Sequence, residues 1–119
     1  MALEDLGRKV ELAWLAAFYG ALLTENQRRV LSLHCEEDMS LSEIAETTGI
    51  SRQGVHETLN RAAEKLRDME NRLHLAARFQ RVEEGLIRCR ASLAAGRLNE
   101  AETVLDELIR LEQEESNGL

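Results

Sequence analysis

The chain has 119 residues, no proline and a formal net charge of −7 at pH 7, which is enough for one domain, or for one small domain with an appended helical arm. The acidic balance excludes a strongly basic nucleic-acid-binding domain, and no apolar run approaches the length of a membrane span. Alanine, leucine, glutamate and arginine dominate without β-branched runs, which predicts an all-α protein. The N-terminus lacks the basic-then-apolar layout of a secretory signal, so we expect a cytoplasmic protein.

Residues 3–23 are predicted to form one amphipathic helix that ends near Gly20. Its apolar positions recur at helical spacing and are Leu6, Val10, Ala13, Trp14, Ala17 and Phe18, with Leu15 and Tyr19 widening the stripe. We expect Trp14 and Phe18 to anchor the core. The alternative for these two aromatic residues is a surface for a partner protein.

A second helix is predicted to begin after Thr24. Thr24 and Gln27 have the spacing of a capping box, in which each side chain bonds the backbone N–H of the other residue. Val30 and Leu31 should then face the core. The acidic run of residues 36–38 ends this helix in a loop.

Residues 40–66, with the sequence SLSEIAETTGISRQGVHETLNRAAEKL, have the pattern of a helix-turn-helix. Ser40 and Glu43 form a second capping box at the start of the first helix. Gly49 can adopt the left-handed conformation that a short turn between helices needs, and Ser51 caps the second helix. At spacings of three and four, the second helix should bury Val55, Leu59, Ala62 or Ala63, and Leu66.

The opposite face of this second helix is polar, and a polar face held out by a compact turn can lie in a groove of nucleic acid. The side chains that could contact base edges are Arg52, Gln53, His56, Asn60 and Arg61. Those that could contact phosphates fall on nearly one helical face and are Arg61, Lys65 and Arg72. The alternative is a solvated helix face with ordinary salt pairs.

The helical pattern continues beyond the motif as a seam of leucines that repeat every seven residues, namely Leu59, Leu66 and Leu73. We predict a long helix from Arg52 to about His74 and, with or without a bend, another to about Ala94. Gly85 is the weak point of that second helix. The leucine seam, together with residues 82–111, favours a homodimer, and the alternative is a monomer whose arm folds back on the domain.

Residues 82–111 are predicted to form a helical hairpin. Gly96 suits the position just after a helix, and Asn99 with Glu102 resembles the cap of the last helix. We therefore predict two parts: a helix-turn-helix domain with a long trailing helix over residues 1–80, and a C-terminal helical hairpin arm over residues 81–119.

No motif in the sequence indicates catalysis, and we expect neither an enzyme nor a cofactor. The glycines lack the strand–turn–helix context of a phosphate-binding loop. The histidines, which are His34, His56 and His74, have no nucleophile or carboxylate partner at a known catalytic spacing. Cys35 and Cys89 form no CxxC pair, so we expect two reduced structural thiols and no metal site.

Residues 23–67 resemble region 4 of the primary-type sigma factors. The matching features are the opening L-T-x-x-Q/E-R, the first helix S-L-x-E-I-A and the turn G-I-S-R. With FYGALLT before this stretch and ENRLHL after it, the chain resembles, over roughly residues 3–80, the YlxM family. Members of that family are small bacterial helix-turn-helix proteins encoded beside the signal recognition particle GTPase.

The resemblance implies a sigma region 4-like helix-turn-helix bundle with a regulatory or accessory role in the signal recognition particle pathway. The implied partners are the particle's GTPase, its RNA, or both; the alternative is a transcriptional regulator that binds duplex DNA. Region 4 reads a promoter with side chains early in its recognition helix, and the matching positions here are Arg52, Gln53, His56 and Glu57. Arginine can fork onto guanine and glutamine onto adenine. Glu57 departs from the pattern, because a carboxylate repels phosphate unless it accepts from a cytosine amine.

Overall fold

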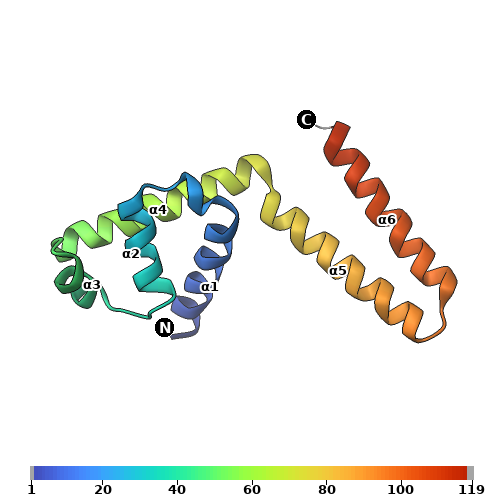
Figure 1. Ribbon diagram of the computed structural model, residues 1–119, viewed down its shortest axis with the longest axis horizontal. Coiled ribbons are helices and arrows are strands. Elements are labelled where there is room, and N and C mark those ends of the chain that lie inside the picture. The colour runs from blue at the N-terminus through green and yellow to red at the C-terminus, as the bar shows by residue number, and fades with distance from the viewer. Residues whose placement is uncertain (1, 118–119) are drawn as a thin grey trace. The chain divides into compact units, whose positions relative to one another are not determined.

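The computed structural model describes the backbone of residues 2–117 and the side chains of residues 6–114. Within this range the chain forms six α-helices, one short 3-10 helix and no strand (Figure 1), which confirms the all-α fold class. The elements are α1 (Ala2–Tyr19), η1 (Gly20–Leu22), α2 (Glu25–Cys35), α3 (Leu41–Thr48), α4 (Arg52–Leu73), α5 (Leu75–Ala94) and α6 (Leu98–Asn117). The chain divides into two compact units, Met1–Ala76 and Ala77–Leu119.

The first unit is organised around α4, which contacts α1, α2 and α3. All four helices contribute aliphatic side chains to one core, in which α1, α2 and α3 surround the apolar face of α4. The buried residues are Leu12, Leu15, Tyr19, Leu23, Val30, Leu31, Ile44, Val55, Leu59, Ala62, Ala63, Leu66 and Ala76. The apolar face predicted for the second helix of the motif is therefore confirmed.

The helix starts follow the predicted capping chemistry. At α2, Thr24 Oγ1 accepts from the backbone N–H of Gln27 at 3.1 Å, and Gln27 Oε1 accepts from that of Thr24 at 3.0 Å. Ser40 and Glu43 form the same reciprocal pair at the start of α3. Both capping boxes are confirmed, and each satisfies two backbone donors that a helix terminus leaves without partners.

The predicted buried stripe of α1 is mostly exposed, and of its two predicted aromatic anchors only Phe18 packs against the core. Trp14 is 36% exposed, Leu6 is 58% exposed and Val10 is 61% exposed, whereas Leu12 and Leu15 are buried. Apolar residues surround much of α1, so two stripes share the same helical spacing, and only packing against α2 and α4 selects the buried one. The exposed stripe lines a shallow groove of about 560 Å³, and its role as a surface for a partner protein stays a prediction.

The leucine seam is not available for pairing two copies. Leu59 and Leu66 are buried in the core of the first unit, and only Leu73 is exposed. The seven-residue repeat that suggested a pairing surface arises because α4 buries one stripe against three neighbouring helices of its own chain. The predicted end of this helix is confirmed, since α4 ends at Leu73 and His74 adopts a left-handed φ of 56°.

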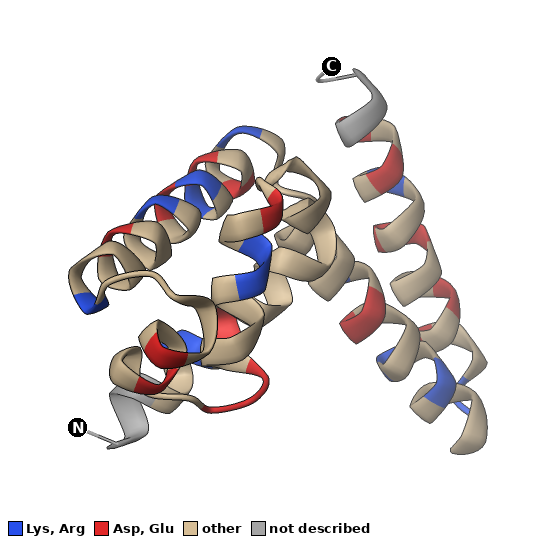
Figure 2. Cartoon of the chain, turned by 60° about the vertical axis from the view of Figure 1, so that its left-hand side comes forward, with Lys and Arg blue, Asp and Glu red and all other residues tan. Residues whose placement is uncertain are grey.

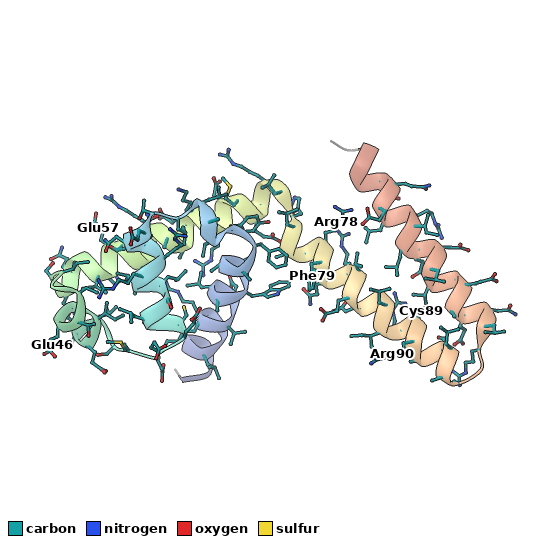
Figure 3. All side chains as sticks on the ribbon, in the orientation of Figure 1. Glu46, Glu57, Arg78, Phe79, Cys89 and Arg90 are labelled. Carbon is teal, nitrogen blue, oxygen red and sulfur yellow. The ribbon has the colours of Figure 1, made fainter. Side chains whose placement is uncertain are left out.

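The second unit is a hairpin of α5 and α6, which lie side by side (Figure 1). Gly96 has a φ of 75°; its N–H donates to Leu93 O at 3.1 Å, and the next N–H, of Arg97, donates to Ser92 O at 2.8 Å, the two bonds of a Schellman turn. The prediction of Asn99 as the cap was wrong, because α6 begins at Leu98 and Asn99 lies within its first turn. Buried Cys89, Ala101 and Val104 form the small interior, and Figure 3 shows Cys89 between the two helices.

Candidate nucleic-acid interface

The turn between α3 and α4 holds the start of α4 in a defined place. Gly49 ends α3 with a φ of 76°, and Ile50 packs against the core. Ser51 Oγ then accepts from the backbone N–H of Gly54 at 3.0 Å. The predicted glycine and serine roles are both confirmed.

Gly54, in the first turn of α4, is a residue that the sequence reasoning missed. A Cβ at this position would lie 2.8 Å from Ile50 Cγ2 and 3.0 Å from Ser51 Oγ. The turn therefore closes tightly against the first turn of α4, and only a glycine allows that approach. The available signal was a glycine three residues after a serine cap. Glycine is unfavourable inside a helix, so its presence there indicates a close contact.

The predicted interface residues lie mostly on the solvent side of α4. Arg52, Gln53, His56 and Glu57 are exposed, and Asn60 is half-buried. Figure 3 shows Glu57 projecting outward from the helix. The first two turns of α4 therefore present polar side chains to solvent, as the helix-turn-helix pattern predicts.

The outward face of α4 is mixed in charge rather than basic. Arg61 forms an ion pair with Glu57 at 2.6 Å, and Arg72 forms one with Asp68 at 3.2 Å. Figure 2 shows basic and acidic positions alternating along the helix. Two of the three predicted phosphate contacts, Arg61 and Arg72, therefore form ordinary salt pairs, which was the alternative. Exposed pairs of this kind contribute at most about 1 kcal/mol, so either arginine can exchange its carboxylate for a phosphate.

The structure does not bring all the predicted residues into one patch. Arg72 follows Arg52 by twenty positions, which is a distance of about 30 Å along a helix. Arg52, Gln53 and Glu57 lie together at the start of α4, whereas Lys65 and Arg72 lie toward its other end.

Two of the predicted residues, His56 and Asn60, line a cleft beside α4 that the sequence did not reveal. The cleft has a volume of about 230 Å³, and leucine side chains of α1, α3 and α4 form its apolar part. Its other polar residues are Arg8 and Lys9 from α1 and His34 from α2. No sequence signal could have grouped them, because the contact joins residues about fifty positions apart.

Lys9 and His34 are held by further contacts at this cleft. Lys9 Nζ donates to Asp38 Oδ1, and this hydrogen bond holds the pKa of the Asp38 carboxyl below its usual range. His34 Nδ1 lies 3.3 Å from Met39 O. A carbonyl oxygen only accepts, so Nδ1 carries the proton in this contact and Nε2 is left for another partner.

The two cysteines predicted to be reduced structural thiols are not paired with each other in the structure. Cys35 and Cys89 are both free, and burial raises the pKa of the Cys35 thiol. Among the side chains that the structure describes, no group of three or more histidine, cysteine or acidic residues could hold a metal ion. None of the helices described has both the length and the apolar character needed to cross a bilayer.

Comparison with known proteins agrees with this geometry. Residues 6–104 match a family described as "Putative helix-turn-helix protein, YlxM / p13 like". The chain is 43% identical over 70 residues to a UPF0122 protein of Desulforamulus reducens, a match that covers 59% of this chain and 60% of that protein. It is 40% identical over 80 residues to one of Staphylococcus carnosus, covering 67% of this chain and 73% of the relative. A relative from Symbiobacterium thermophilum is 46% identical over 70 residues, covering 59% and 65%.

Proposed function

The chain belongs to the UPF0122 family of YlxM / p13-like helix-turn-helix proteins, and we propose that it is a cytoplasmic, non-enzymatic accessory protein that binds nucleic acid through α4 in the signal recognition particle pathway. The pathway and its partners, the particle's RNA and GTPase, are what the family resemblance implies. The nucleic-acid contact is assigned to residues 1–80, and pairing of two copies to residues 81–119.

One observation carries the nucleic-acid contact. Arg52 and Gln53 are exposed on the first turn of α4, next to a turn in which Gly49 has a left-handed backbone and Ile50 and Ser51 pack closely against Gly54. Side chains on a rigid helix start can reach base edges with little loss of conformational freedom, and arginine and amide groups are the commonest readers there. His56, Asn60 and Arg61 extend the proposed contact along α4, with Lys65 and Arg72 as phosphate contacts.

The charge distribution argues for modest affinity and for help from a protein partner. The chain carries a net charge of −7, and Glu57 lies among the outward groups of α4. Non-specific binding depends on neutralising phosphates with lysine and arginine, and here two of the arginines are engaged by carboxylates. A complex in which the particle's GTPase adds contacts is therefore favoured over a nucleic-acid complex of this chain alone.

The second candidate is a transcriptional regulator that reads duplex DNA. The exposure of Arg52 and Gln53 together favours it, because the pair matches the bidentate readout of guanine and adenine. The two candidates differ in ligand and not in the surface used, so one set of variants tests both.

The test is binding of the full chain to the particle's RNA, to duplex DNA and to the assembled particle, measured by fluorescence anisotropy. Arg52→Ala should weaken binding of the preferred ligand by about 1–3 kcal/mol. Arg28 on α2 is also exposed, so Arg28→Ala serves as the control with the same charge change. Affinity should fall roughly tenfold or more between about 50 and 200 mM salt if three or four phosphates are contacted. Equal effects of Arg52→Ala and Arg28→Ala on every ligand would refute contact through α4.

We also propose that two copies pair through the hairpin. Leu86 and Leu93 on α5, and Leu98, Leu105 and Ile109 on α6, are between 42% and 67% exposed. On each helix they lie about a quarter turn from the positions that face the other helix, so in an antiparallel hairpin they share one broad face. The opposite broad face is polar and carries an ion pair of Arg88 with Glu107 at 3.3 Å.

Two features make a second copy the best occupant of that apolar face. Among the side chains that the structure describes, the apolar interior of the hairpin consists of buried Cys89, Ala101 and Val104 with half-buried Leu108, and units of about 40 residues rarely bury enough apolar surface to be stable alone. Two such hairpins joined face to face form a four-helix bundle, and one self-complementary face satisfies a two-fold axis.

A further inference from the structure

The cleft beside α4 gathers basic and amide groups from three helices. Its polar lining consists of Arg8, Lys9, His34, His56 and Asn60, and none of its described lining residues is acidic. The chain has a net charge of −7, so the sign of the charge along this cleft is opposite to that of the protein as a whole. Its ligand should therefore be an anion.

The donors present match the acceptors of a phosphate group. Arg8 is exposed at the cleft and offers a planar fork of N–H donors, which suits phosphate oxygens. Asn60 is half-buried and offers an amide donor, and the imidazole of His56 offers a ring N–H. The Nδ1–H of His34 is engaged by Met39 O, so the neutral His34 ring lines the cleft without a second N–H to donate. Lys9 is paired with Asp38, whose carboxylate offsets its charge, so Arg8 is the main cationic group that the lining offers to a phosphate.

We propose that this cleft binds a phosphate group, and that in the nucleic-acid complex it holds a backbone phosphate beside the stretch that α4 contacts. This inference rests on the proposed nucleic-acid binding and extends that interface from α4 onto α1 and α2. It also changes the role of His56 and Asn60, which line the cleft with Arg8 and so contact phosphate rather than base edges. Gln53 and Arg61 remain on the outward side of α4.

The first experiment titrates the full chain with inorganic phosphate and follows the histidine ring and asparagine side-chain signals by NMR. Signals of His34, His56 and Asn60 should shift together and saturate, whereas sodium chloride at equal ionic strength should leave them in place. Arg8→Ala should weaken phosphate binding several-fold, and Arg28→Ala should not change it. No saturable shift, or an equal response to chloride, would overturn the phosphate site.

The second experiment distinguishes a backbone phosphate from a free phosphate compound. Arg8→Ala should weaken nucleic-acid binding to a similar extent for every sequence, and should reduce the slope of log affinity against log salt by about 0.7–0.9. Phosphate binding without any effect of Arg8→Ala on nucleic acid would overturn the backbone contact. An effect of Arg8→Ala with none of Arg52→Ala would support the cleft and refute base contact through the start of α4, so the two proposals fail separately.

Discussion

At the residue scale, Tyr19 joins the end of α1 to the break between α4 and α5. Its side chain is 2% exposed, and its hydroxyl donates to Glu70 Oε1 at 2.6 Å and accepts from the backbone N–H of Leu75 at 3.0 Å. Glu70 Oε1 also accepts from the backbone N–H of Ala76 at 3.0 Å. Two side chains thus satisfy the first backbone donors of α5, which have no carbonyl partner within the helix.

Removing the Tyr19 hydroxyl should destabilise the first unit. Tyr19→Phe keeps the ring but leaves the Leu75 N–H and one acceptor site of Glu70 without their partner, a change that costs about 1–3 kcal/mol. The measurement is urea denaturation, in which the midpoint should fall without a change in slope. An unchanged midpoint would show that water replaces the hydroxyl at no cost.

Ionisation of Tyr19 should lower the stability of the folded state at alkaline pH. Burial, and then the hydrogen bond to Glu70, raise the pKa of Tyr19 above its ordinary value, so the folded state holds the proton more tightly than the unfolded state. This contribution is complete below about pH 10 and is lost as the pH rises through the folded-state value. The chain has one tyrosine, so tyrosinate absorbance reports it directly. Tyr19→Phe should remove this part of the alkaline loss of stability, and a native midpoint at the ordinary value would contradict the account.

At the scale of one element, Gly85 allows α6 to approach α5. A Cβ at Gly85 would lie 2.5 Å from Leu108 Cδ2 and 3.0 Å from its Cγ. Glycine within a helix normally costs up to about 1 kcal/mol relative to alanine. Here that loss is offset by close packing in a hairpin with a small interior, so the predicted weak point is a contact site.

Gly85→Ala should therefore destabilise the hairpin, by about 1–3 kcal/mol, because the added methyl group overpacks against Leu108. Gly7→Ala is the matched control: no atom lies within 4 Å of its added Cβ, and it should stabilise α1 by about 0.5–1 kcal/mol. Amide hydrogen exchange in α5 and α6 measures the first change, and Leu108→Ala in the same chain should recover part of the loss. A gain in protection for Gly85→Ala would show that Leu108 moves aside freely.

At the scale of the whole molecule, two features of the hairpin point to the same assembly. Its interior is small, and one broad face carries half-exposed leucines. Pairing through the leucine seam of α4 is ruled out by the burial of Leu59 and Leu66. The homodimer is therefore proposed through α5 and α6 alone, which leaves α4 of each copy for nucleic acid.

Light scattering at micromolar concentration should give twice the chain mass of 13.5 kDa. Leu86→Glu combined with Leu105→Glu should reduce it to the mass of one chain, because a carboxylate placed in an apolar interface loses its hydration. Ala91→Glu, on the opposite polar face, should leave the dimer intact. A single-chain mass for the unaltered protein would refute pairing, and dissociation by Ala91→Glu would place the contact on the other face.

The amino-acid sequence by itself determined where most helices begin and end. The caps at Thr24, Ser40 and Ser51 and the turns at Gly49 and Gly96 depend on residues three to five positions apart, so the local sequence is enough to predict them. The exposed start of α4 followed from the same local rules, because its apolar residues define the opposite face.

Only the tertiary structure decided which surfaces face each other. α1 has two apolar stripes of equal spacing, and packing placed Leu12 and Leu15 inside and Trp14 outside. The Tyr19–Glu70 bond, the contact of Gly85 with Leu108 and the meeting of Arg8 with His56 join residues from about twenty to fifty positions apart. Helical periodicity predicts which residues share a face of a helix. Whether that face is buried, and against which residues, depends on the helix that packs against it.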